Sequence, residues 1–224
     1  MIKRLIFDID GTLITGVSFD KAIKSTLEKV GAFSEENVQK CITAIGTYET
    51  VNGSYQREKY LRHFSDALGI ELDEEFLYGF FGNLARFAVP EDSSELLKML
   101  DNLSKKYELA LLSNYFEQSQ RGRLERIGVN GYFSEYYGEK VCKPDRQVYL
   151  DAIGKHKPYE CIMIGDNLDL DIIAAKKCGL NTIWVNEKRI LQNRVRTASV
   201  RCVTEIDEKL INRIERATSE LDER

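Results

Sequence analysis

Short runs of apolar residues recur along the chain and are separated by longer stretches with helical spacing. These runs cover residues 5–7, 109–112, 161–164 and 182–185. A compact apolar run of this length is typical of a strand that is buried on both faces, as strands of a parallel sheet are. The alternation of such strands with helices favours βαβ units.

Three further segments place apolar residues at the three- and four-residue spacing of an amphipathic helix. They are residues 94–103, 169–178 and 206–217. The second segment stops at Gly179, a residue suited to the left-handed end of a helix. Together with the strands, these helices predict an α/β protein whose core is a Rossmann-like, doubly wound parallel sheet.

The segment 16–89 has a different pattern, because it lacks strand-like runs and keeps helical spacing. Three glycines and an expected turn at residues 80–82 divide it into about four helices. The glycines are Gly31, Gly53 and Gly69. We therefore predict a core domain made of residues 1–15 and 90–224, with residues 16–89 inserted as an all-helical cap domain.

Composition and charge narrow the class of ligand. The chain has 224 residues, of which 43% are hydrophobic and 30% charged, as in a globular protein with a core. A net charge of −4 with interspersed signs leaves no broad basic face for nucleic acid. We interpret one basic cluster as solvated surface; its members are Lys188, Arg189, Arg194 and Arg196. A small-molecule substrate fits better.

The cysteines and the N-terminal segment bear on location. The five cysteines form an odd set without close pairs: Cys41, Cys142, Cys161, Cys178 and Cys202. This pattern favours reduced thiols over a disulfide framework or a zinc ribbon, so we expect a cytoplasmic protein. The apolar run before Asp8 is too short for a signal peptide or a membrane span, and we expect no membrane association.

Two carboxylates follow the first predicted strand directly. Asp8 and Asp10 should lie at the carboxyl end of that strand, where open α/β sheets bind their ligands. Gly11 permits a sharp turn after them. Close together, the two acids could divide nucleophilic attack and proton transfer, although aspartates at such a position also serve as ordinary helix or loop caps.

Three more polar sites follow predicted strands in chain order. Ser113 and Asn114 follow residues 109–112 and could offer a hydroxyl and backbone amides to a phosphate oxygen. Lys143 supplies a cation ahead of a proline. Asp166 and Asp171 crowd the junction after residues 161–164. Taken singly, such a serine is usually a helix cap and such a lysine a surface residue.

The charges of these sites predict a metal. Asp8, Asp10, Asp166 and Asp171 gather four potential negative charges against a single evident cation, Lys143. Crowded carboxylates are costly without a counter-ion. Magnesium fits best, because it prefers oxygen ligands and bridges to substrate phosphates.

The ordered set of sites resembles the four motifs of the haloacid dehalogenase superfamily, across nearly the whole chain. The matching residues are Asp8-Ile9-Asp10-Gly11-Thr12-Leu13, Ser113-Asn114, Lys143-Pro144-Asp145, and Gly165-Asp166 with Asp171. The helical insert is similar to the cap of phosphatases of the phosphoglycolate phosphatase and pyrimidine 5'-nucleotidase type. The resemblance implies a magnesium-dependent hydrolase of small phosphomonoesters that works through an aspartyl-phosphate.

The resemblance also implies roles for the acids. Asp8 would be the nucleophile, and Asp10 would protonate the leaving group and then activate water. Asp8 and Asp166 would bind Mg²⁺ through their carboxylates and Asp10 through its backbone carbonyl. Asp171 would support the metal site, with Thr12 as a second supporting residue.

The same resemblance assigns the phosphate-binding residues and leaves one position open. Ser113, Asn114 and Lys143 would hold the transferring phosphoryl group, and Lys143 would also restrain Asp8. Arg146 departs from the family pattern, in which many members have proline after Lys-Pro-Asp. This departure leaves the mechanism unchanged.

Three alternatives share this fold. A 2-haloacid dehalogenase would not need Asp10, since a halide leaves without a proton. A sugar phosphomutase would use the same aspartyl-phosphate but would need a cap that excludes water. A non-catalytic binding protein would not need all four motifs. We favour a phosphatase, with a nucleoside monophosphate ahead of phosphoglycolate or a sugar phosphate, a mobile cap that selects it, and a monomer or homodimer.

Overall fold

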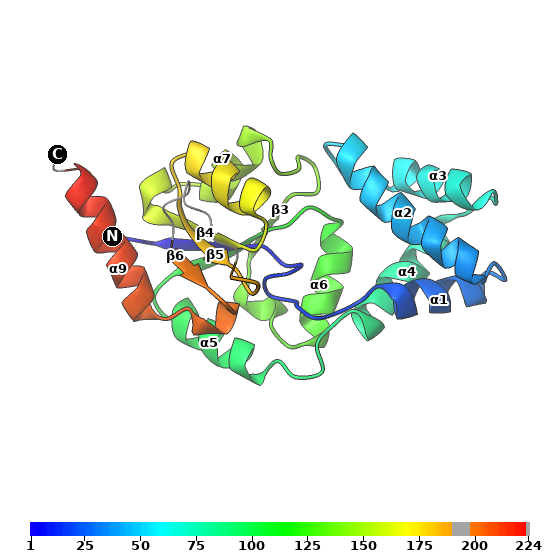
Figure 1. The fold of residues 1–224 in the computed structure, drawn as a ribbon, viewed down its shortest axis with the longest axis horizontal. Coiled ribbons are helices and arrows are strands. Elements are labelled where there is room, and N and C mark those ends of the chain that lie inside the picture. Colours follow the sequence, from blue (N-terminus) through cyan, green and yellow to red (C-terminus); the bar gives the residue numbers. More distant parts are fainter. Residues whose placement is uncertain (190–197, 223–224) are drawn as a thin grey trace.

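The computed structural model describes residues 1–189 and 198–222, with side chains up to residue 218, so Arg194 and Arg196 of the basic cluster lie outside it. A six-stranded parallel sheet with the order β3-β2-β1-β4-β5-β6 forms the centre of the fold (Figure 1). The strands are β1 (Arg4–Phe7), β2 (Glu108–Leu112), β3 (Glu135–Tyr137), β4 (Cys161–Gly165), β5 (Asn181–Val185) and β6 (Ala198–Val200). The strand order reverses between β1 and β4, and open sheets of this kind bind ligands at that point, outside the carboxyl ends of the strands.

The predicted doubly wound sheet is confirmed, and its four predicted strands are β1, β2, β4 and β5. The sequence pattern missed β3 and β6. Both are three-residue strands at the edges of the sheet, and neither contains an apolar run. Period and hydrophobicity carry little information over so short a segment.

Helices cover both faces of the sheet. The helices are α1 (Asp20–Lys29), α2 (Glu35–Val51), α3 (Arg57–Leu68), α4 (Glu74–Phe87), α5 (Ser94–Ser104), α6 (Glu117–Arg126), α7 (Arg146–Ile153), α8 (Ala174–Lys177) and α9 (Glu208–Asp222). Side chains of β1 alternate between two hydrophobic clusters: Leu5 and Phe7 pack with α5, α6 and α9, whereas Ile6 packs with α7 and α8.

The predicted helix 169–178 forms in two parts. Leu168–Ile173 is π-helical, and α8 completes the segment. It ends before Gly179, whose φ of +86° is the left-handed conformation expected at this helix end. The last predicted helix begins at Glu208, two residues after the expected Ile206.

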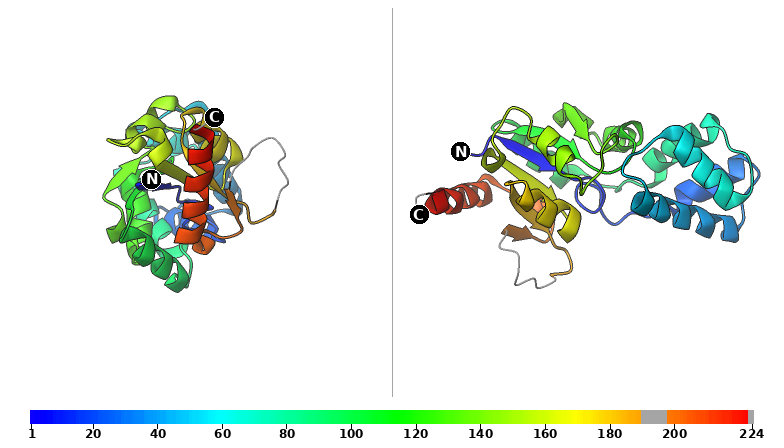
Figure 2. Two further views of the ribbon diagram at one scale, coloured as in Figure 1. Left: turned by 90° about the vertical axis from the view of Figure 1, so that its left-hand side faces the viewer. Right: turned by 90° about the horizontal axis from the view of Figure 1, so that it is seen from above.

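Helices α1 to α4 form a separate layer at one end of the molecule, as Figure 2 shows, while the N-terminus and α9 lie at the other end. We call this layer the cap. Its interior is a hydrophobic cluster of its own, centred on side chains such as Tyr60, Phe64 and Phe80. The expected turn at 80–82 is wrong, because these residues lie inside α4, where Phe80 and Phe81 are buried. The boundaries between 15 and 16 and between 89 and 90 stay predictions.

The cap is joined to the sheet domain by more than its two chain connections. Tyr115 and Cys142, from the sheet domain, pack into the hydrophobic cluster of the cap. Two backbone hydrogen bonds link the loop after α2 to the loop before Lys143. Tyr55 N donates to Glu139 O (2.7 Å), and Cys142 N donates to Gly53 O (3.0 Å). None of the described helices is long and apolar enough to cross a membrane.

Candidate active site

The turn after β1 places two carboxylates at the carboxyl edge of the sheet. Asp8 N donates to Ile164 O of β4 (2.9 Å), which extends the strand pairing up to the acid. Gly11 then turns the chain with φ of +79°. A Cβ atom built on Gly11 would lie 2.4 Å from Asp166 Oδ2, so glycine is required for the loops after β1 and β4 to approach each other.

Lys143 joins the buried acids. Its Nζ lies 2.7 Å from Asp8 Oδ1 and 2.6 Å from Asp171 Oδ1, and the lysine side chain is 4% exposed. Although burial disfavours the ammonium ion, the carboxylates of Asp171 and Asp8 raise the pKa of Lys143. Burial also raises the pKa of Asp8 to about 7, despite the attraction of Lys143. One cation shared by two buried carboxylates leaves one negative charge uncompensated.

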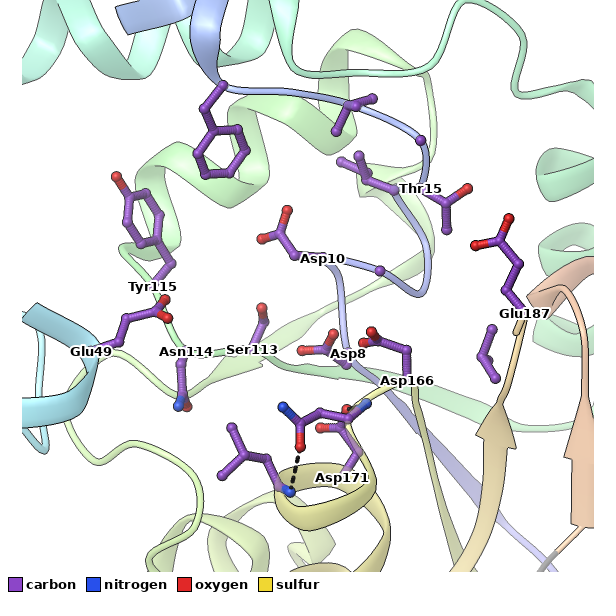
Figure 3. Close-up of a pocket in the computed structure, with 18 of the residues that line it drawn as sticks. Asp8, Asp10, Thr15, Glu49, Ser113, Asn114, Tyr115, Asp166, Asp171 and Glu187 are labelled. Atoms are coloured by element: carbon purple, nitrogen blue, oxygen red, sulfur yellow. Dashed lines mark hydrogen bonds between the residues drawn. The ribbon is translucent and has the colours of Figure 1, made fainter. Parts of the chain in front are cut away.

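A third carboxylate meets this pair. Oxygens of Asp8, Asp166 and Asp171 all lie within 4.8 Å of one another, and Figure 3 shows the three side chains in one part of the site. Burial, followed by the charge of Asp8, raises the pKa of Asp166 to about 6. Trp184 Nε1 donates to the Asp166 carbonyl (2.9 Å) and so fixes this loop to β5.

Asp171 is held more tightly than Asp166. Besides its ion pair with Lys143, its Oδ2 accepts a hydrogen bond from Asn167 N (2.9 Å), and burial raises its pKa. A Cβ on Gly165 would lie 2.2 Å from Asp171 Cγ, so this carboxylate packs directly on the end of β4. With both oxygens engaged, Asp171 orients Lys143.

Asp10 has two partners that sequence reasoning missed. Arg123 Nη1 donates to Asp10 Oδ1 and Gln120 Nε2 donates to Asp10 Oδ2, both at 2.7 Å. The side chain of Asp10 is 42% exposed, whereas that of Arg123 is 1% exposed. Arg123 also donates twice to Ala88 O, at 3.0 and 2.9 Å. These contacts leave Asp10 facing the cavity in one orientation (Figure 3).

The sequence carried little signal for Gln120 and Arg123. Both belong to α6, a strongly polar helix whose buried side chains include Ser119 as well as these two residues. Because polar residues normally mark the exposed face of a helix, hydrophobic periodicity points away from this face. The spacing of three residues between Gln120 and Arg123 indicates only that the two side chains lie on the same face of α6.

The predicted phosphate-binding residues lie beside Lys143. Ser113 is buried, and its Oγ lies 3.4 Å from Gln120 Nε2. The side chain of Asn114 holds the backbone of Lys143, donating to its carbonyl (3.0 Å) and accepting from its N–H (2.7 Å). Thr12 is fully buried, and its hydroxyl has no hydrogen-bond partner within the described part of the chain.

The four aspartates, Ser113, Asn114 and Lys143 line a cavity of about 850 Å³ between the sheet edge and the cap. Phe19, just before α1, and side chains of α2 such as Glu49 line the cap side. The loop after β5 lines another side of the cavity with Glu187 and Lys188. Lys188, which was predicted to be solvated surface, is exposed but also lines the cavity. Figure 3 shows Glu49 and Glu187 on opposite sides of the site.

The buried carboxylates at the carboxyl edge of a doubly wound sheet, beneath a helical cap, define a hydrolase of the α/β class. Residues 2–179 match the family of haloacid dehalogenase-like hydrolases. The chain belongs to this family, which confirms the resemblance of its motifs.

Individual relatives agree with this assignment. The chain is 27% identical over 206 residues to pyrimidine 5'-nucleotidase YjjG of Escherichia coli (strain K12), covering 81% of this chain and 85% of that protein. The fold is similar to that of the putative HAD-hydrolase YfnB of Bacillus subtilis bound to magnesium (TM-score 0.67, 21% identity, 93% and 98% of the two chains). It is also similar to that of a 2-haloacid dehalogenase from Pseudomonas syringae pv. Tomato DC3000 (TM-score 0.69, 19% identity, 95% and 99%).

Proposed function

We propose that the protein is a magnesium-dependent phosphatase that hydrolyses small phosphomonoesters, with Asp8 as nucleophile and Asp10 as acid and base. The observation that carries this proposal is the position of Asp10. A second carboxylate, oriented by Arg123 and Gln120 and open to the cavity, stands beside a buried carboxylate that is restrained by Lys143. Such a pair suits a reaction that needs both a nucleophile and a proton carrier.

The reaction has two steps. An oxygen of Asp8 attacks phosphorus, the bond between phosphorus and the leaving oxygen breaks, and Asp10 gives that oxygen a proton. Asp10 then removes a proton from a water molecule whose oxygen attacks phosphorus. The bond between Asp8 and phosphorus breaks, which releases phosphate and restores the carboxylate.

The residues of the site fit a magnesium ion. Three carboxylates have oxygens within 4.8 Å of one another and share one buried cation, Lys143, while burial raises the pKa values of Asp8 (about 7) and Asp166 (about 6). Asp8, Asp166 and the backbone carbonyl of Asp10 would hold the ion. When bound, it would neutralise charge on the phosphoryl oxygens. Ser113 and Lys143 would contact the same oxygens.

Asn114 has a different role in this proposal from the one predicted for its side chain. Both ends of its amide group are occupied by the backbone of Lys143. We therefore propose that the Asn114 side chain positions Lys143, while its backbone N–H faces the phosphoryl group. Thr12 and Asp171 would support the site from within the protein.

The dehalogenase alternative fits the site less well. The similarity to the dehalogenase from Pseudomonas syringae, at 19% identity, concerns the fold. A halide departs without a proton, so a dehalogenase has no use for the bonds that orient Asp10. A phosphomutase would need the cavity to exclude water, and a binding protein would need no nucleophile.

We also propose a nucleoside monophosphate as substrate, which the similarity to a pyrimidine 5'-nucleotidase supports. The protein would act as a monomer or homodimer in the cytoplasm, where its five free thiols stay reduced.

Activity against p-nitrophenyl phosphate tests the chemistry. We expect hydrolysis with Mg²⁺, loss of activity in EDTA and recovery when Mg²⁺ is restored. Asp8→Asn should abolish turnover and the acid-stable, hydroxylamine-sensitive phosphoenzyme. Asp10→Asn should slow breakdown of the phosphoenzyme more than its formation, because nitrophenolate needs little protonation. Full activity in EDTA, or release of chloride from 2-chloropropionate by the wild type, would refute the assignment.

A further inference from the structure

The cavity is lined by acidic side chains outside the phosphate site as well as within it. Three charged side chains line the cap and the loop after β5 with a negative sign, namely Asp20, Glu49 and Glu187. Among the described lining residues, the cations are Lys143, which is engaged by two carboxylates, and Lys188, which adjoins Glu187. The described cap residues of the lining include no lysine or arginine.

Glu49, one of these three carboxylates, is oriented by a neighbouring side chain. Tyr55 Oη donates to its Oε1 (3.0 Å), which leaves Oε2 to accept a hydrogen bond from a ligand. Although Glu49 is exposed to solvent, partial desolvation raises its pKa, and the bond from Tyr55 opposes that shift. Figure 3 shows the side chain reaching from α2 toward Asn114 and Tyr115.

Tyr55 holds Glu49 because it is itself immobilised. Its side chain is buried, and its ring centroid lies 5.3, 5.3 and 5.2 Å from those of Tyr48, Tyr115 and Phe116. Aromatic clusters of this kind fix side-chain geometry. A carboxylate that is already oriented loses little conformational entropy when a ligand binds to it.

Two aliphatic side chains continue the same face of α2. Ile42, Ile45 and Glu49 are spaced by three and four residues, so they lie in a row along the helix, and all three line the cavity. This row offers an apolar surface followed by a hydrogen-bond acceptor. It is complementary to a leaving group that has an apolar face and a hydroxyl or amino donor.

We propose that Glu49 selects the leaving group, so that the preferred substrates are phosphomonoesters of neutral alcohols with hydrogen-bond donors, as nucleoside 5'-monophosphates are. Esters whose leaving group carries a second anion are rejected. This inference rests on the phosphatase function proposed above. Like charges brought together in a cleft oppose binding, whereas a donor paired with Glu49 favours it.

The test compares kcat/KM for three substrates with Mg²⁺: uridine 5'-monophosphate, phosphoglycolate and p-nitrophenyl phosphate. Wild type should prefer uridine 5'-monophosphate over phosphoglycolate. In Glu49→Gln, which removes the charge but keeps a carbonyl acceptor, the preference should fall by about tenfold or more. Glu49→Lys should reverse it. In Glu49→Gln the loss on p-nitrophenyl phosphate, whose leaving group offers Glu49 no donor, should be smaller than the loss on uridine 5'-monophosphate.

Glu36→Gln is the matched control. It removes the same charge from the exposed first turn of α2, where Glu36 pairs with Lys40 outside the cavity lining, and it should leave the preference unchanged. An unchanged preference in both Glu49 variants, or equal losses on all three substrates, overturns the inference. Absence of hydrolysis of every substrate by the wild type would instead refute the phosphatase function.

Discussion

At the scale of single residues, the site depends on polar side chains that are buried with their partners. Arg123 has four hydrogen bonds: one each to Asp10 and Gln120, and two to Ala88 O. Its guanidinium carbon also lies 5.3 Å from the ring centroid of Phe19, at the start of the cap. One side chain thus contacts the proposed acid and both connections between the cap and the sheet domain.

Arg123→Met tests this arrangement. We expect the free energy of unfolding to fall by about 1–3 kcal/mol, because Ala88 O loses its donors in a buried position. We expect kcat to fall by about ten- to a hundredfold, because Asp10 loses one of the two bonds that orient it. Steady-state kinetics and urea unfolding provide the two measurements.

The control for that change lies one turn further along the same helix. Arg126→Met removes an exposed arginine from α6 and should alter neither quantity. If Arg123→Met kept the kcat of the wild type, Asp10 would be oriented without Arg123. The assignment of Arg123 as a positioning residue would then be wrong.

The residues that could be predicted from sequence are those that follow strands. Asp8 and Asp166 were found because a strand end fixes where the next side chain lies, and Lys143 was found through the Lys-Pro-Asp motif; the structure brings all three together. Gln120 and Arg123 could not be found in this way. Their burial depends on the packing of α6 beneath the cap, a contact between segments that are far apart in the sequence.

At the scale of elements, close approaches of the backbone shape the phosphate side of the site. Gly138 follows β3 with φ of +113°, and a Cβ on it would lie 2.2 Å from Ser113 O. Tyr136 Oη donates to the same oxygen (2.8 Å). The short edge strand β3, which the sequence pattern did not reveal, thereby fixes the loop that carries Ser113 and Asn114.

Gly138→Ala should displace that loop. The new methyl group meets backbone atoms, which cannot move aside as a flexible side chain can, and the positive φ adds strain. We expect the free energy of unfolding to drop by about 2 kcal/mol or more and phosphatase activity to fall with it. Chemical denaturation and the aryl phosphate assay measure both effects.

Gly46→Ala serves as the comparison. Gly46 lies inside α2, and nothing lies within 4 Å of a Cβ built there. Alanine should therefore stabilise the helix by about 0.5–1 kcal/mol. A Gly138→Ala protein as stable and active as the wild type would show that the loop tolerates displacement.

The elements themselves were predicted where they are long or fully apolar. Four strands and three helices of the core, α5, α8 and α9, follow from runs and periodicity, whereas α6 and α7 were not predicted. The turn expected at 80–82 failed because an aromatic pair beside a glycine also occurs within a buried helix. Packing of Phe80 and Phe81 into the cap interior keeps α4 continuous through Gly82.

At the scale of the whole molecule, the acidic centre links stability to pH and to metal. In the metal-free protein, the pKa values of Asp8 (about 7) and Asp166 (about 6) lie above their ordinary value of 3.8. Between about pH 4 and pH 7 the folded state therefore holds more protons than the unfolded state, and this contribution to stability decreases as pH rises.

Magnesium should reverse that loss. Because the ion binds the ionised carboxylates, 10 mM MgCl₂ should raise Tm more at pH 7.5 than at pH 5.0 in differential scanning fluorimetry. Asp166→Asn should remove most of the increase in Tm that MgCl₂ causes. Comparing the variant with the wild type at each pH cancels the effect of all other carboxylates, which the two proteins share. A larger increase at pH 5.0 would contradict the proposed ligands.

The hydrogen bonds between residues 53–55 and 139–142 give the cap a third attachment, beyond its two chain connections. The two chain connections alone would let the cap rotate away from the sheet domain. The third attachment resists that rotation, because opening the cap would break both hydrogen bonds. At about 0.5–1.5 kcal/mol for each bond, the two bonds add about 1–3 kcal/mol to the packing of Tyr115 and Cys142 in favour of the closed arrangement. If release of the alcohol requires the cap to open, this attachment beside Lys143 would limit turnover once the chemistry at Asp8 is faster than opening.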